Sequence, residues 1–313
     1  TSTNAARVTW TFTTTGQIGF SGFKVYRSAS AFTTIAGLTP IATLTDTARS
    51  FADPGLDRAQ THHYAVVAFN GLGQSVTAVT SKPWTDPLSG TLSTNFTASD
   101  PLVVITQPLT IGGGATFTVP PGTVVAFAPG ASLTGEPGRL VADGTIFAPI
   151  VFTSLADVDN GARARGSWNG ITLADTSRAS TLRNVWIKYG KGLAISGGTH
   201  TVDTLGAAWN EVGGLRLSGA AVLSTQSAYF SDNAVGASIA DGAALTLAGS
   251  VLRNNGVNAV ASGGGTLTAT GNWWGTADAA AIAATLSGPV NAASPLVGEP
   301  VLTRGLRPAD GAA

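Results

Sequence analysis

Carboxylate side chains are the first residues to test for chemistry, because glycoside hydrolysis uses two carboxyl groups about 5–9.5 Å apart. Five consecutive segments of 22 residues, over 170–279, align one under another, and this alignment places the acidic residues relative to one another. Asp175 and Asp241 share a position three segments apart, which corresponds to about 14 Å if the segments are stacked strands. Only Glu211 and Asp232 fall within about one segment of each other.

Basic side chains would have to stand beside such carboxylates in a lyase. Lys188, Lys191 and Arg253 lie near the turns of the repeat, but they do not converge with several carboxylates at one place. We therefore expect no catalytic residues, and we predict that the protein is not an enzyme. A polysaccharide lyase or glycoside hydrolase stays as the alternative.

The histidines and the acidic loop do not form a pattern that predicts a metal site. His62 and His63 are adjacent in an expected strand, so their side chains point to opposite faces, and His200 stands alone. The loop at 155–166 contains Asp157, but it lacks the spacing and the closing Glu of a calcium-binding EF-hand loop. The chain has no Cys. We expect no metal and no cofactor.

Trp273 and Trp274 are adjacent in the last repeat, within the sequence GNWWG. Adjacent indoles can form a platform on which a sugar ring stacks, which makes both residues candidate glycan contacts. The terminal coil of a stacked repeat also needs bulky residues to cover its open core. Both interpretations are carried forward.

The repeat itself predicts the architecture that positions these residues. Short alternating runs broken by Gly, Asn and Asp indicate strands and turns, and a fixed period of this length is typical of a solenoid. The segments begin at Gly170, Gly192, Gly214, Gly236 and Asn258. Apolar residues recur at the second and fourth positions of each segment, so we expect them to form ladders inside the solenoid.

Two further columns of the alignment carry expectations about packing and about the turns. A later apolar column is expected to lie in the core and contains Trp186, Ala208, Phe230, Leu252 and Trp274. Two positions beyond it, three segments carry a polar pair: Asn210-Glu211, Asp232-Asn233 and Asn254-Asn255. These turns predict a hydrogen-bonded asparagine ladder, with a binding cleft as the alternative.

Residues 88–297 resemble a right-handed parallel β-helix of the kind found in bacterial surface and adhesin-type proteins of the pectate-lyase-like fold group. The resemblance rests on LTIGGGATFTVPPGTVVAFAPGASL, on GRLVADGTIFAPIVFTS and on the closing NWWG motif. It implies an all-β fold in which 22-residue coils wind around one elongated core.

Residues 1–84 resemble a fibronectin type III domain, an immunoglobulin-like sandwich. The runs VTW, GFKVYRS, IATL, SFADPGL and YAVVAFNGLGQS are similar to its strands B to G. The resemblance places Trp10 in the core and Tyr64 at the tyrosine-corner position. Too few residues precede VTW to form the family's first strand, so the sandwich is expected to lack it.

The tail, residues 298–313, is a candidate for that missing strand. Its apolar residues Val301, Leu302 and Leu306 are expected to pair beside Val8 and Trp10 of a neighbouring copy, as a donated strand. Such contacts need not close and would propagate as a filament. A tail that links tandem domains, or chance similarity, stays open. Residues 85–87 are the expected linker between the two domains.

Composition limits the partners that we expect. The 17 basic and 17 acidic residues cancel, and only 11% of residues are charged, so neither nucleic acid nor an anionic membrane is indicated. No apolar run is long enough to insert into a bilayer. A chain that begins at Thr1 and has no Met is expected to be a piece of a longer, exported precursor.

The sequence therefore predicts a non-enzymatic extracellular structural protein of the cell surface. Its expected partners are other copies of itself, assembled head to tail as a filament. The alternative is an adhesin module that binds surface polysaccharide.

Overall fold

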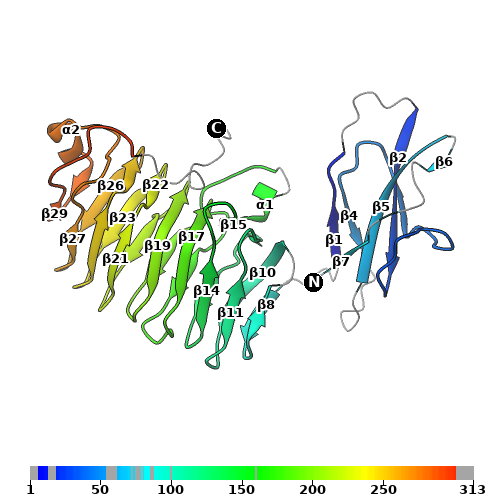
Figure 1. The fold of residues 1–313 in the computed structure, drawn as a ribbon, viewed down its shortest axis with the longest axis horizontal. Coiled ribbons are helices and arrows are strands. Elements are labelled where there is room, and N and C mark those ends of the chain that lie inside the picture. Colours follow the sequence, from blue (N-terminus) through cyan, green and yellow to red (C-terminus); the bar gives the residue numbers. More distant parts are fainter. Residues whose placement is uncertain are drawn as a thin grey trace. The chain divides into compact units, whose positions relative to one another are not determined.

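The fold is described from a computed structural model, which divides the chain into two units, Thr1–Asp86 and Pro87–Ala313. The described residues are 6–12, 19–53, 62–71, 73–74, 79, 81–84, 88–98, 101–158 and 161–300. Figure 1 labels the helices and strands of both units.

The first unit consists of antiparallel strands. These strands are β1 (Ala6–Thr9), β2 (Phe20–Ser28), β3 (Ala42–Leu44), β4 (Ser50–Asp53), β5 (His62–Asn70), β6 (Gly73–Gln74) and β7 (Lys82–Trp84). One sheet has the order β3-β2-β5-β6, with β7 also paired to β5, and β1 pairs with β4 in a two-stranded sheet. The assignment of this unit to the fibronectin type III family is not confirmed and stays a prediction.

Tyr64 ties the strands of this unit together. Its hydroxyl donates to Asp53 Oδ2 at 2.8 Å, and Arg27 Nη1 lies 2.6 Å from the same oxygen. Burial, followed by the adjacent Asp53 carboxylate, raises the pKa of Tyr64, so the hydroxyl remains a hydrogen-bond donor. Val25 packs against the Tyr64 ring inside the unit, and Val8 and Trp10 are partly buried beside them.

The second unit is a right-handed parallel β-helix of about nine turns with about 22 residues per turn, as the sequence predicts. Its coils stack side by side in Figure 1. Three long strands each cross from one face to the next: β10 (Leu102–Ile111), β17 (Thr181–Lys188) and β19 (Thr201–Ala208). We number the three faces of the helix I to III.

Face I contains the first half of β10, the second halves of β17 and β19, and four short strands. These are β12 (Val124–Phe127), β15 (Ile150–Ser154), β22 (Tyr229–Ser231) and β25 (Val251–Arg253).

Face II contains the second half of β10 and eight other strands. These are β8 (Leu88–Leu92), β13 (Leu133–Gly135), β16 (Ile171–Leu173), β18 (Leu193–Ile195), β20 (Leu215–Leu217), β23 (Val235–Ile239), β26 (Val257–Ala261) and β28 (Leu286–Ser287).

Face III contains the first halves of β17 and β19, together with β9 (Phe96–Thr97), β11 (Thr116–Val119), β14 (Arg139–Asp143), β21 (Val222–Gln226), β24 (Ala244–Ala248), β27 (Thr266–Thr268) and β29 (Val290–Asn291). Two short helices complete the unit: α1 (Leu155–Val158) after β15, and α2 (Ala279–Ala283) in the last coil.

The core of the helix consists of the predicted inner ladders. On face II, residues 22 positions apart pair directly, as in Leu193 with Leu215 and Leu215 with Ala237. These side chains are buried, and each fully buried leucine contributes about 1.5–3 kcal/mol through the removal of its apolar surface from water. A coil can bury this face only against its neighbours, so stability depends on the stack.

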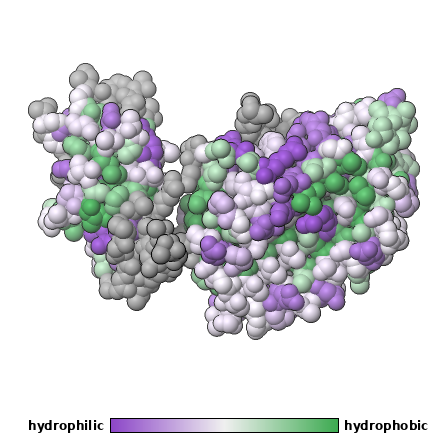
Figure 2. All heavy atoms as spheres, turned by 180° about the vertical axis from the view of Figure 1, so that it is seen from behind, coloured by the Kyte–Doolittle hydropathy of each residue, from purple (hydrophilic) through white to green (hydrophobic). Residues whose placement is uncertain are grey.

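The surface of the second unit is not uniformly polar. In Figure 2, hydrophobic residues gather in a band across the larger unit, and hydrophilic residues border it. No helix in the described part of the chain is both long and apolar enough to span a membrane.

Trp186 departs from the predicted core column because the coil lengths vary. It pairs with Gly206, 20 residues later, and Gly206 pairs with Tyr229, 23 residues later. An odd coil length reverses which side chains point inward, so Phe230 enters the core whereas Trp186 and Ala208 point outward. A Cβ atom at position 206 would lie 2.5 Å from the Trp186 ring, so only glycine fits there.

The polar turns between face I and face II form the asparagine ladder that the sequence predicts. Asn233 Nδ2 donates to Ala207 O at 2.9 Å, and Asn233 Oδ1 accepts from the backbone N–H of Asn210 at 3.0 Å. Asn255 repeats the pattern one coil later, where its Nδ2 donates to Phe230 O. The side chains thereby satisfy buried backbone groups of the turns, as buried polar groups require.

Replacing Asn233 with Ala should destabilise the helix by about 2–4 kcal/mol, because it leaves the Ala207 carbonyl and the Asn210 N–H buried without partners. Urea unfolding measures the change. Asn169→Ala is the matched control, since Asn169 is exposed and donates one hydrogen bond, to Gly130 O. A loss for Asn233→Ala as small as that for the control would contradict the structural role of the ladder.

Candidate functional site

Face I carries a continuous outward row of side chains along the solenoid. Each member pairs in register with the next, and the last pair is an isolated bridge. This outer row consists of Leu102, Val124, Val151, Trp186, Gly206, Tyr229, Val251 and Trp273. Aromatic residues therefore occupy the half of the row nearest the C-terminal end, and aliphatic residues occupy the other half.

A second row lies beside the outer row, two residues further along each strand. Lys188 pairs with Ala208, Ala208 with Ser231, and Ser231 with Arg253. Two small side chains are thus placed between two cations. We call the surface over Lys188, Ala208, Ser231 and Arg253 the trough.

Aromatic side chains flank the trough on both sides. On the side of the outer row, Trp186 and Tyr229 meet edge to face with ring centroids 5.8 Å apart. On the side of the turn, Tyr189 and Trp209 stack at 5.3 Å with an interplanar angle of 10°. The cations join them, with the Arg253 guanidinium 5.7 Å from the Tyr229 ring. Trp209 and Trp273 are half-buried and retain exposed ring surface.

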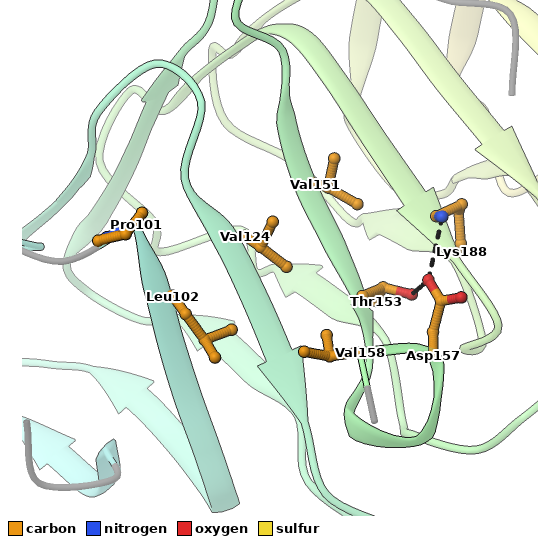
Figure 3. Close-up of a pocket in the computed structure, with 8 residues that line it drawn as sticks. All are labelled: Pro101, Leu102, Val124, Val151, Thr153, Asp157, Val158 and Lys188. Atoms are coloured by element: carbon orange, nitrogen blue, oxygen red, sulfur yellow. Dashed lines mark hydrogen bonds and ion pairs between the residues drawn. The ribbon is translucent and has the colours of Figure 1, made fainter. Parts of the chain in front are cut away.

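A pocket of about 400 Å³ opens at the aliphatic end of the outer row (Figure 3). The labelled side chains come from β10, β12 and β15, from α1 and from the end of β17. Its apolar lining is Pro101, Leu102, Val124, Val151 and Val158, and its polar lining is Thr153, Asp157 and Lys188.

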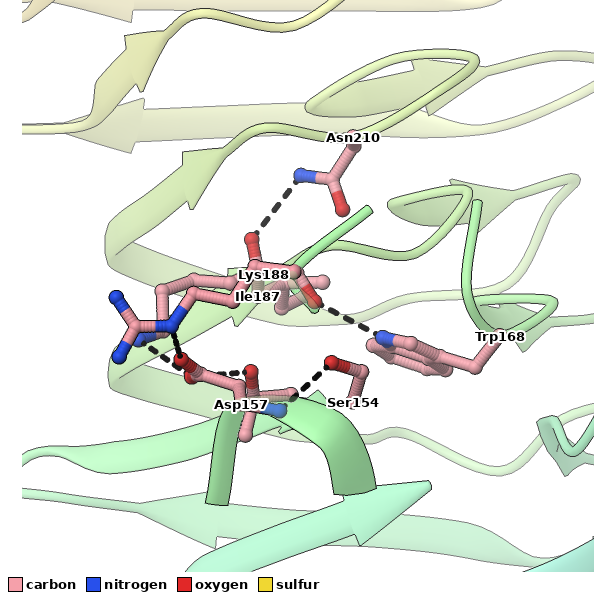
Figure 4. Close-up of polar contacts among 8 residues, drawn as sticks. Ser154, Asp157, Trp168, Ile187, Lys188 and Asn210 are labelled. Carbon is pink, nitrogen blue, oxygen red and sulfur yellow. Dashed lines mark hydrogen bonds and ion pairs between the residues drawn. The ribbon is translucent and has the colours of Figure 1, made fainter. Parts of the chain in front are cut away.

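Asp157 holds the polar wall of the pocket together (Figure 4). Its carboxylate lies 3.0 Å from Lys188 Nζ and 2.8 Å from Arg163 Nε, and it accepts a 2.7 Å hydrogen bond from Thr153 Oγ1. Its backbone N–H is bound by Ser154 Oγ. One carboxylate thus lies between two cations, which leaves a net positive charge at the rim of the pocket.

The loop that supplies Asp157 and Arg163 is the stretch that interrupts the repeat in the sequence. Trp168, just after it, stacks on Phe127 at 3.9 Å and donates from Nε1 to Lys188 O at 2.9 Å. These contacts attach the end of the loop to the core and to β17. Burial and the Asp157 carboxylate raise the pKa of Tyr189 beside this cluster, so its hydroxyl remains protonated.

The sequence identified Lys188 and Asp157 separately but did not bring them together. They are 31 positions apart and meet because the loop returns to face I. The interruption at 155–166 was the available signal, since insertions in a repeat often carry binding residues.

The carboxylates that the alignment compared are not assembled into a metal site. Glu211 is exposed beside Gly166 of the loop, and Asp232 lies in the turn after β22 with a positive φ of 57°. Within the described residues, no group of three or more His, Cys, Asp or Glu side chains could hold a metal ion. Asp159 and Asn160 lie outside the described residues.

The two adjacent tryptophans have different surroundings because successive residues of a strand point to opposite sides. Trp274 is 2% exposed and packs in the core with Ile282 of α2, so it covers the last coil and offers no surface to a glycan. Trp273 belongs to the outer row and is half-buried. The assembly residues Val301, Leu302 and Leu306 lie outside the described residues, so their pairing beside Val8 and Trp10 stays a prediction.

His200 has a structural environment. Its Nδ1 accepts from the Ser180 N–H at 3.1 Å, and Nε2 lies 3.0 Å from Gly197 O, which requires a neutral ring that donates from Nε2. Burial lowers the pKa of His200, although the hydrogen bond to Gly197 acts in the opposite direction.

Comparison with known proteins gives a partial picture. No protein-family model and no curated protein matches the chain. A crystal structure of pectate lyase Pel3 from Pectobacterium carotovorum, with two monomers in the asymmetric unit, aligns at 16% identity over 85% of this chain and 77% of that chain, with a TM-score of 0.22. Its single-monomer form aligns at 16% over 79% and 83%, with a TM-score of 0.24.

Pectate lyase PelI from Erwinia chrysanthemi, in complex with tetragalacturonic acid, aligns at 12% identity over 93% of this chain and 99% of that chain, with a TM-score of 0.22. These values limit the similarity to the β-helix fold. The prediction that the protein is not an enzyme is nevertheless contradicted by this comparison, because all three structures are of enzymes. The prediction is withdrawn, and the polar wall of the pocket becomes the place to test for activity.

Replacing Asp157 with Asn should loosen the loop, because Lys188 and Arg163 lose the charge that they share. We expect a protease that cuts after arginine to cleave at Arg163 and Arg165 about five- to tenfold faster than in the unmodified chain. Asp143→Asn, which removes the exposed ion pair to Arg183, is the control and should change nothing. Equal cleavage rates in both variants would show that Asp157 does not hold the loop.

The lowered pKa of His200 predicts a loss of stability in acid. The unfolded chain takes up a proton as pH falls through about 6.5, whereas the folded chain resists it, so the contribution is present above that value and is lost below it. His200→Gln should be less stable near neutral pH and should lose less stability on acidification. Urea unfolding at several pH values measures both effects, and an unchanged pH slope in the variant would contradict this role.

Proposed function

We propose that the protein binds an extended extracellular polysaccharide along face I of its β-helix. The observation that carries the proposal is the outer row, whose eight positions are paired in register and include Trp186, Tyr229 and Trp273. A straight row of this kind suits a long, regular ligand better than a compact one.

The spacing of the row supports a sugar polymer. Neighbouring strands lie about 4.8 Å apart, which is close to the length of one hexose residue in an extended chain. Successive sugars can therefore meet successive coils. The C–H face of a sugar ring packs on aromatic rings, and the half-buried rings of Trp209 and Trp273 offer this surface.

The pocket supports a preference for acidic polysaccharides. Lys188 and Arg163 together outweigh the single charge of Asp157, so the rim attracts anions. Thr153 and Lys188 supply polar groups for hydroxyl or carboxylate oxygens, while Val124 and Val151 contact apolar ring faces. These side chains are also the ones that could act on a bound sugar chain.

Binding to acidic and neutral polysaccharides tests the proposal directly. We expect the full chain to bind an acidic polysaccharide, and Trp209→Ala and Trp273→Ala each to weaken binding about five- to thirtyfold, corresponding to about 1–2 kcal/mol per ring. Phe147→Ala is the matched control, because Phe147 is 92% exposed and does not belong to the outer row.

The same mixtures should be assayed for chain cleavage, since shortened products that depend on Asp157 or Lys188 would extend the proposal from binding to catalysis. Absence of binding to every polysaccharide would reject it. Equal effects of Phe147→Ala and Trp209→Ala would also reject the assignment to face I.

A cell-surface subunit that assembles head to tail is the second candidate. One observation favours it: β1 pairs with β4 alone in a two-stranded sheet, so in the described part of the chain its other edge has no partner strand. An open edge can accept an added strand. This candidate requires the tail of each copy to be free, which the next experiment measures.

A further inference from the structure

The chain turns back over face I after its last coil. The backbone N–H of Leu296 donates to Asn272 O at 2.9 Å, beside Trp273 at the end of the outer row. Three residues later, Glu299 Oε2 lies 3.6 Å from Arg253 Nε, on the preceding coil. Residues 296–299 therefore travel back toward the start of the helix and arrive at the end of the trough.

The floor of the trough is buried although it points away from the core. Ala208 and Ser231 are 0% and 2% exposed, and their side chains are too small to cover one another. The walls beside them, Trp186 and Tyr229, are also buried while belonging to the outward side of face I. An apolar segment laid along the trough would account for this burial.

The segment that follows Pro300 fits the trough in length and chemistry. Its apolar residues are Val301, Leu302 and Leu306. Six extended residues span about 20 Å. The trough, from Arg253 to Lys188, covers three strand spacings, or about 14 Å. A chain that is already attached through Glu299 loses little entropy when it continues into an adjacent apolar channel.

We propose that residues 301–306 bind in the trough of their own chain, with Val301, Leu302 and Leu306 against the walls that Trp186, Tyr229 and Trp209 provide. The segment then occupies the aromatic half of the outer row and leaves the pocket at the other end open. Its competition with polysaccharide rests on the proposed function, whereas its binding in the trough does not.

A single thiol can report this contact, because the chain has no native Cys. Ser231→Cys places a thiol of nearly the same size on the floor of the trough. Its rate of reaction with a water-soluble thiol reagent is measured in the full chain, in the chain ended after Pro300, and with Glu299→Arg. Val222→Cys on face III is the matched reporter, because Val222 is 71% exposed.

We expect the thiol of the Ser231→Cys variant to react about tenfold or more faster when the segment is removed, and also faster with Glu299→Arg. Adding Arg253→Glu to Glu299→Arg restores an ion pair of reversed polarity and should restore slow labelling. The Val222→Cys reporter should react equally fast in every background.

Three outcomes would overturn the proposal. Labelling of the trough thiol that is equally slow without residues 301–313 would mean that other parts of the chain cover the trough. Labelling equally fast in the full chain would mean that nothing covers it. Protection that disappears on dilution would assign the trough to the segment of a second copy.

Polysaccharide binding by the same variants separates this inference from the proposed function. Faster labelling with tighter polysaccharide binding in the shortened chain supports both. Faster labelling without any polysaccharide binding retains the contact and rejects the proposed function.

Discussion

The stacking of one coil on the next is the constraint on which the rest of the structure depends. A single coil has an apolar inner side that it cannot bury alone, so its stability comes from the backbone hydrogen bonds and the side-chain contacts that it makes with both neighbours. On face II this produces ladders of like residues in direct register, such as Leu193 on Leu215. The turns obey the same rule, because Asn210, Asn233 and Asn255 each bind backbone groups of a neighbouring coil.

Stacking also organises the outside of the helix, and departures from the regular repeat create its distinctive features. Coils of 20 and 23 residues turn Trp186 outward and bring Gly206 beneath its ring. The interruption after β15 supplies Asp157, which binds Lys188 and Arg163 at the end of the same row. The regular coils thus provide a straight scaffold, and the irregular ones provide the aromatic surface and the charged pocket.

The arrangement on face I combines a long apolar row with a compact ion-pair cluster. An ion pair that is largely withdrawn from water is held by geometry as well as by charge, since losing one partner leaves the other charge uncompensated. The cluster therefore positions the α1 loop as well as lining the pocket. Similarity to pectate lyases is confined to the fold, so any activity of this chain must be argued from these residues themselves.

The amino-acid sequence alone determined the solenoid, its period, the inner ladders and the asparagine ladder, because each of these depends on residue type recurring at a fixed interval. It could not determine the direction of Trp186, since one extra residue in a coil reverses every side chain after it and the alignment assumed a constant length. It separated neither Trp273 from Trp274 nor a platform from a cap, because strand direction decides which ring is buried. The meeting of Asp157 with Lys188 and the return of Glu299 to Arg253 were decided by the tertiary structure, because a loop and a tail carry no periodicity that places them on a face.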